Sequence, residues 1–206
     1  MKHVLLIRVG MLGDTIWGAS PIKALLEHYG PETKIDLVVK KGMGGLFQYD
    51  PRVARVFEVS KRRLPLLLSP AKLRILLHSI VHPYELAIDL ESKGFFKSLL
   101  WLLRTNKTIS ARAVRHQIEV PVEHAVDAFR KIIGFVIPNV CAKLGAPELF
   151  APPSADIRSL IPVDGPYICL HFGNSWVSSG KSALRSWPSA HWQQLLLHWK
   201  SRFPHH

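Results

Sequence analysis

The residues best suited to chemistry near the start of the chain are two glycines and a carboxylate. Positions 8–15 read Arg-Val-Gly-Met-Leu-Gly-Asp-Thr, directly after an apolar run. Glycines let the backbone turn tightly, and a carboxylate at such a turn could act as a general base. Asp14 could equally cap the next helix by accepting backbone N–H groups, which is worth about 1 kcal/mol. The residue types alone leave both roles open.

A second candidate site lies in the glycine- and serine-rich segment 173–186, which carries Lys181 and Arg185. It follows an apolar run and precedes a helix that Pro188 would open. Backbone N–H groups, the positive end of a helix and two cations would together bind a phosphate. The alternative is a surface loop that merely leads into the helix.

Composition favours an anionic partner. The 206 residues carry a formal net charge of +12, which raises the local concentration of phosphates and carboxylates. A well-solvated basic surface explains the charge equally well. Nucleic-acid binding rests on charge alone, because no aromatic-rich motif or recognition helix supports it, and we expect none.

Several signals point to a cytoplasmic protein without a metal. The first apolar run is too short for a signal peptide, and no apolar stretch reaches the ~20 residues that span a bilayer. Cys141 and Cys169 are typical of reduced core thiols. His78 and His82 have metal-ligand spacing on a helix but no third ligand. The basic helical segment 72–82 could lie on an anionic membrane surface.

The elements that must position these residues alternate between short apolar runs and segments of helical period. This alternation is typical of a parallel sheet covered by helices. We expect strands at 4–7, 35–39, 54–59, 86–90 and 108–111. We expect helices at 15–29, 42–49, 70–82, 95–104 and 124–133. Five strands with crossovers predict an α/β, doubly wound sheet, in which ligands bind beyond the carboxyl ends of the strands.

The texture of the sequence changes after position 137. Prolines and small residues fill 138–165, which we interpret as an interdomain linker between a domain at 1–137 and a second one that begins at 166. An apolar strand at 167–171 and a helix after Pro188 would open that second domain. The chain ends where its next strand would be due, so we expect a truncated domain at 166–206 and exposed apolar surface that promotes association.

Several segments together resemble the lipopolysaccharide heptosyltransferases, which form glycosyltransferase family 9. They are VGMLGDT with ASPIKAL, DPRVARVFEV before KRR, ELAIDLESKGFFKS, EHAVDAFRKIIG, and LHFGNS with RSWPSAHW. They cover nearly the whole chain. The resemblance implies a GT-B fold, in which two Rossmann-like domains face each other across a cleft.

The resemblance also implies an activity, the inverting transfer of heptose from ADP-heptose to the lipopolysaccharide inner core. Asp14 matches the catalytic base that deprotonates the acceptor hydroxyl. Lys61, Arg62 and Arg63, with Gly13, match the acceptor side, where carboxylate and phosphate groups of a Kdo-lipid A acceptor would lie. Guanidinium groups suit such anions, although a solvated charge cluster is the alternative for this run.

On the donor side, the resemblance assigns Arg185 to the phosphates of the nucleotide sugar. Gly173 and Asn174 match residues that line the donor loop, and Lys181 lies in a stretch longer than the family pattern. No metal or other cofactor is implied. The acceptor implies contact with the cytoplasmic face of the inner membrane. A truncated, non-catalytic remnant that binds an anionic glycolipid or a protein is the alternative to an active transferase.

Overall fold

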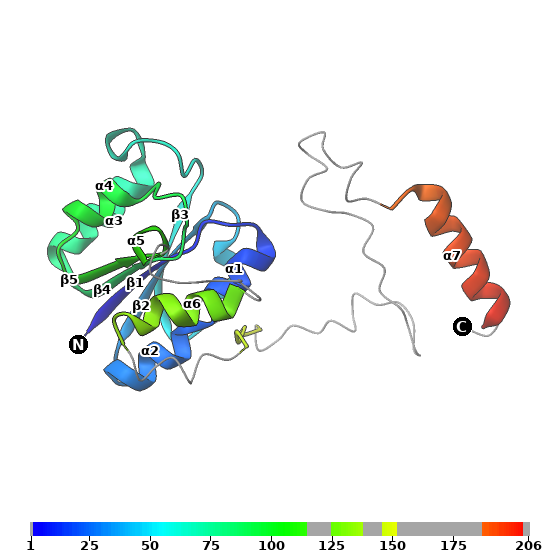
Figure 1. The fold of residues 1–206 in the computed structure, drawn as a ribbon, viewed down its shortest axis with the longest axis horizontal. Helices are drawn as coiled ribbons and strands as arrows, with labels where there is room; N and C mark the ends of the chain where they lie inside the picture. Colours follow the sequence, from blue (N-terminus) through cyan, green and yellow to red (C-terminus); the bar gives the residue numbers. More distant parts are fainter. Residues whose placement is uncertain (1, 115–124, 138–145, 152–186, 204–206) are drawn as a thin grey trace. The chain divides into compact units, whose positions relative to one another are not determined.

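The computed structural model describes residues 2–114, 125–137, 146–151 and 187–203. Its centre is one sheet of five parallel strands in the order β3-β2-β1-β4-β5 (Figure 1). The strands are β1 (His3–Ile7), β2 (Lys34–Lys40), β3 (Val53–Val59), β4 (Tyr84–Asp89) and β5 (Thr105–Ser110). The predicted α/β class with five strands is confirmed.

Helices connect the strands and cover both faces of the sheet. They are α1 (Leu12–Gly18), α2 (Pro21–Tyr29), α3 (Pro70–Val81), α4 (Lys97–Leu102), α5 (Ala111–Val114) and α6 (Ala125–Gly134). Two 3₁₀ turns, η1 (Gly44–Phe47) and η2 (Leu66–Leu68), follow β2 and β3. None of the helices in the described ranges is long and apolar enough to span a membrane.

The core has two layers because the side chains of β1 alternate between the faces of the sheet. Val4 and Leu6 pack with residues of α2 and α6, whereas Leu5 and Ile7 pack with residues of α3 and α4. All four side chains are buried, as expected for a central strand of a parallel sheet with helices on both sides.

Some predicted boundaries are wrong. The helix predicted at 15–29 is two helices, because Pro21 starts α2 as its first residue and Gly18 ends α1. The first of them begins three residues earlier than predicted. Strand β5 also begins earlier, at Thr105, and its exposed polar residues mark it as an edge strand. The short α5 was not predicted.

The strand order places a topological switch point between β1 and β4. From β1 the chain first adds β2 and β3 on one side, and then returns to add β4 and β5 on the other. Ligands of doubly wound sheets bind at this point, beyond the carboxyl ends of the strands. Ile7 at the end of β1 pairs with Asp89 at the end of β4, so the residues that follow both strands converge there.

The chain divides into two compact units, Met1–Pro152 and Pro153–His206. In the second unit the described residues form helix α7 (Ser189–Arg202), which begins directly after Pro188, as predicted. The strand predicted at 167–171 lies outside the described residues. The predicted domain limits remain predictions.

Candidate active site

Asp14 lies at the switch point and is held by two hydrogen bonds. Arg8 Nη2 donates to its Oδ1 at 2.7 Å, and the backbone N–H of Met11 donates to its Oδ2 at 3.2 Å. Asp14 is therefore not the N-cap, because the helix begins earlier and Asp14 occupies its third position, from which it reaches back to the cap residue. Its side chain remains 46% exposed, so the anchored carboxylate is open to a ligand.

Two glycines make room for this ion pair. A Cβ atom added to Gly10 would lie 2.2 Å from Cβ of Asp14, and one added to Gly18 would lie 2.6 Å from Cγ of Arg8. Any side chain at either position would therefore displace one member of the pair. Gly13 has open space around it and lies on the exposed first turn of α1, next to Asp14.

Glu91, two residues beyond β4, ties the ends of the two central strands together. Its Oε1 accepts from the N–H of Val9 at 3.1 Å and from Arg8 Nη1 at 3.4 Å, and its Oε2 accepts from Arg62 Nη1 at 3.0 Å. Glu91 is buried. A chain of charged contacts thus runs from Asp14 through Arg8 and Glu91 to Arg62.

Asp89 is the last residue of β4, and its side chain is fully buried close to Glu91 and Arg8. Its Oδ1 accepts from the N–H of Glu91 at 2.9 Å, whereas its Oδ2 has no hydrogen-bond partner in the described residues. Burial raises the pKa of Asp89 to about 7, although the N–H of Glu91 and the charges of Arg8 and Lys72 oppose this shift. Asp89 is also one of the residues around a cavity of about 450 Å³ near the ends of β4 and β5.

The raised pKa of Asp89 predicts a pH-dependent stability. The folded chain holds this proton up to about pH 7, whereas an unfolded chain releases it near pH 4. The free energy of unfolding should therefore fall as the pH rises from about 4 to about 7, by at most roughly 4 kcal/mol from this group. The measurement is urea denaturation of the wild type and of Asp89→Asn at several pH values. The difference between their two curves of unfolding free energy against pH gives the contribution of Asp89. Parallel curves would contradict the prediction.

The three residues of the basic run, Lys61 to Arg63, make different contacts in the structure. Arg62 turns inward to Glu91 and to the carbonyl oxygen of Val9, which it reaches at 3.0 Å. Arg63 lies with its guanidinium 5.8 Å from the centre of the Phe95 ring, over which Arg62 also lies at 5.4 Å. Lys61 lines a separate cavity. The structure therefore brings Arg62 to Asp14 through Glu91, and places Lys61 and Arg63 further out.

Lys72 fixes the loop that carries this run. Its ammonium donates to the carbonyl oxygens of Arg62, Leu64 and Phe95 at 2.9, 2.7 and 2.8 Å. Its side chain is buried, so the prediction that segment 72–82 presents its lysine to a membrane is wrong for this residue. Burial lowers the pKa of Lys72, and the three carbonyl oxygens supply the partners that a buried ammonium requires.

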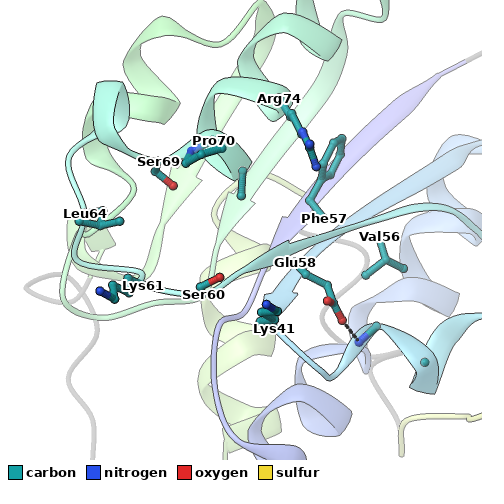
Figure 2. A pocket seen from close by; sticks show the side chains of 13 residues that line it. Lys41, Val56, Phe57, Glu58, Ser60, Lys61, Leu64, Ser69, Pro70 and Arg74 are labelled. Carbon is teal, nitrogen blue, oxygen red and sulfur yellow. Dashed lines mark hydrogen bonds between the residues drawn. The ribbon is translucent and has the colours of Figure 1, made fainter.

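The cavity that Lys61 lines has a volume of about 620 Å³ (Figure 2). It lies beside β3, between the loop after β2 and the first turn of α3. Lys41 and Arg74 also line it, and neither was predicted as a site residue. The structure thus offers a half-exposed carboxylate at the switch point and a basic cavity near the sheet edge.

The remaining residues singled out from the sequence include the four on the donor side and His78. Gly173, Asn174, Lys181 and Arg185 are outside the described residues. His78 is partly buried and lies against the buried Asp36, with Nε2 and Oδ2 3.0 Å apart, and Tyr84 donates to the same oxygen at 2.9 Å. The described ranges contain no group of three or more residues arranged to hold a metal ion. His78 therefore pairs with the buried Asp36.

Sequence reasoning missed Arg8, Asp89 and Glu91 as site residues. The signal was available, because Arg8 directly follows β1, Asp89 ends β4 and Glu91 lies two residues beyond it, and ligands bind beyond the ends of such strands. For Lys72 there was no signal, since a lysine in a helical segment is normally exposed.

Comparisons with known proteins concern the fold. No family model matches the sequence, and a search of curated proteins gives no match. Among solved structures, the chain is similar to a glycosyl transferase family 9 protein from Veillonella parvula, with a TM-score of 0.59 and 13% identity over 77% of this chain and 48% of that one. It is also similar to E. coli heptosyltransferase WaaC with ADP, with a TM-score of 0.60 and 16% identity over 96% of this chain and 64% of that one.

A second WaaC structure, with ADP-2-deoxy-2-fluoro heptose, gives a TM-score of 0.61 at 16% identity, over 96% of this chain and 65% of that one. These likenesses confirm the predicted resemblance at the level of the fold, a Rossmann-like domain of GT-B type. The chain spans about half to two thirds of the length of these structures.

Proposed function

We propose that this chain belongs to a glycosyltransferase that moves heptose from ADP-heptose to an anionic, lipid-linked saccharide of the Kdo-lipid A type. Asp14 is the base in this proposal. It takes the proton of the acceptor hydroxyl while the hydroxyl oxygen attacks the anomeric carbon from the face opposite to the leaving ADP, so the anomeric configuration inverts. The new bond is C–O, the broken bond is the sugar–phosphate bond, and ADP leaves with the electron pair.

The observation that carries the proposal is the geometry of Asp14 at the switch point. Its carboxylate is oriented by Arg8 and by the N–H of Met11, yet nearly half of its side chain is exposed. A general base must be fixed in direction and accessible to the proton it removes. The fold likeness to glycosyltransferase structures, one of them with an ADP-sugar, supports the same reaction class.

Neighbouring residues take supporting roles in this reaction. Arg62 and Glu91 hold Arg8 and the end of β1 in place. Lys61 and Arg63 are exposed and bind carboxylate or phosphate groups of the acceptor, and Gly13 leaves space beside Asp14. Arg185, with Gly173, Asn174 and Lys181, binds the donor phosphates. No metal takes part in the proposal, because these cations neutralise the phosphates instead.

The acceptor also determines where the protein acts. A lipid-linked saccharide lies at a bilayer surface, and ADP-sugars are cytoplasmic metabolites, so we place the reaction at the cytoplasmic face of the inner membrane.

Incubation of the full chain with ADP-heptose and a Kdo-containing lipid A tests the proposal. We expect release of ADP together with a mass increase of the acceptor by one heptose. Titration calorimetry with each substrate separates the outcomes. Acceptor binding without donor binding or transfer would favour a non-catalytic protein that binds anionic glycolipids. If neither substrate binds, the proposal fails.

A further inference from the structure

Three cationic side chains line the basic cavity near the sheet edge. Lys41 follows β2, Lys61 follows β3, and Arg74 lies on α3 (Figure 2). Within the described residues, none of these three side chains makes a hydrogen bond or an ion pair. All three are exposed. Cations gathered from three elements around one cavity raise its potential, so the cavity attracts an anionic group.

Among the described residues that line the cavity, Glu58 is the one carboxylate, so the three cations outnumber it. Oε1 of Glu58 accepts from the N–H groups of Gly42 at 3.1 Å and Gly44 at 2.8 Å. Gly42 has a φ of +88°, and a Cβ on Gly44 would lie 2.8 Å from the same oxygen. Glycine at both positions lets the loop after β2 close around Glu58, so that this carboxylate faces the backbone N–H groups of the loop.

Two leucines between the cavity-lining residues Leu64 and Ser69 have strongly exposed side chains. Leu64 lines the cavity and Leu66 is buried, but Leu67 is 80% exposed and Leu68 is 66% exposed. Both leucines belong to η2. This segment is held against the protein by the buried side chain of Leu66 and by the hydrogen bond from Lys72 to the carbonyl oxygen of Leu64, so the two leucines lie on a fixed loop. Apolar side chains beside cations are typical of surfaces that insert into the boundary of an anionic bilayer.

We propose that this lipid-docking surface, formed by Lys41, Lys61, Arg74, Leu67 and Leu68, binds an anionic phospholipid bilayer. The lipid phosphate enters the basic cavity, and the two leucines enter the apolar layer. A soluble phosphate would use only the cations and leave the leucines in water, and a nucleic acid would likewise gain nothing from them. The pairing of both features on one segment therefore favours a lipid. The inference deepens the proposed function, which places the acceptor at a membrane, but it concerns binding alone.

Vesicle flotation of the full chain tests the inference. We expect binding to phosphatidylcholine vesicles that contain phosphatidylglycerol, weaker binding at high salt, and little binding to phosphatidylcholine alone. The net charge of +12 attracts any anionic surface, so the decisive result is the comparison of matched variants.

Two double variants remove the two halves of the surface. Lys41→Gln with Arg74→Gln should lower the vesicle partition coefficient about 25-fold, since each cation near an anionic bilayer contributes roughly a factor of five. Leu67→Ser with Leu68→Ser should lower it on the order of tenfold or more, because the inserted apolar area is lost. All four side chains are exposed, so unfolding midpoints should not change.

Matched controls lie elsewhere on the sheet domain. Lys107→Gln removes an exposed cation from β5, the opposite edge strand, and Phe135→Ser removes an exposed apolar side chain just beyond α6. Both should leave vesicle binding within about twofold of the wild type. Equal losses of vesicle binding in the controls and in the double variants would overturn the inference. It would also be overturned if the leucine variant bound vesicles like the wild type while free inorganic phosphate competed with the vesicles for the protein. Loss of glycosyl transfer with intact vesicle binding would count against the proposed function only.

Discussion

Replacing Asp14 by Asn should lower the rate of glycosyl transfer by about 10²- to 10⁴-fold, the usual contribution of a positioned general base. The amide is almost isosteric, but Arg8 and the N–H of Met11 donate to different oxygens of Asp14. An amide has a single acceptor oxygen, so the variant keeps one of these two hydrogen bonds. What is lost is the ability to take a proton from the acceptor hydroxyl. The measurement is kcat for ADP release, with KM for both substrates determined separately.

Asp127→Asn is the matched control for this variant. Asp127 is 42% exposed and pairs with Arg130 at 2.9 Å on α6, so it resembles Asp14 in exposure and in having an arginine partner. Its replacement should change neither kcat nor KM. An Asp14→Asn enzyme that retained more than about a tenth of the wild-type kcat would rule out a general-base role for this residue.

The central part of the fold could be predicted because the buried residues of its strands are apolar apart from Asp36 in β2 and Asp89 at the end of β4. Val4–Ile7 and Ile35–Val39 are buried on both faces, and such runs have few alternatives to a parallel strand. Strand β5 was harder, because its lysine and threonines lie at an exposed edge and carry no apolar period. The break before α2 could have been found from Pro21, since proline is favoured in the first turn of a helix.

The site was only partly predictable, because its contacts join segments far apart in the sequence. Asp14 and Arg8 are close in the chain, and a carboxylate beside a glycine turn is a local signal. The link from Arg8 to Glu91 spans 83 positions and depends on β1 and β4 being neighbours, which sequence pattern alone does not order. The burial of Lys72 is of the same kind, because its acceptors come from two separate loops.

Glu91 should be the residue of this site on which folding depends most. Glu91→Ala would leave Arg8, Arg62 and the N–H of Val9 without their shared acceptor. Breaking a buried ion pair costs 3–5 kcal/mol. Both guanidinium groups keep some access to water here, so we expect a loss at the lower end, about 3 kcal/mol, in urea denaturation.

Glu91→Gln separates the charge of this residue from its hydrogen bonds. The amide oxygen can still accept from Val9, so stability should recover in part, whereas the attraction that orients Arg8 is weakened. Because Arg8 in turn holds Asp14, kcat should fall for this variant even where folding is intact, with KM for the donor unchanged. Glu85→Ala is the control, since this half-buried residue lies on the same strand β4 and accepts a hydrogen bond from Asn106. If Glu91→Ala and Glu85→Ala were equally stable, Glu91 would not connect the ends of β1 and β4, and Asp14 would have to be held by Arg8 alone.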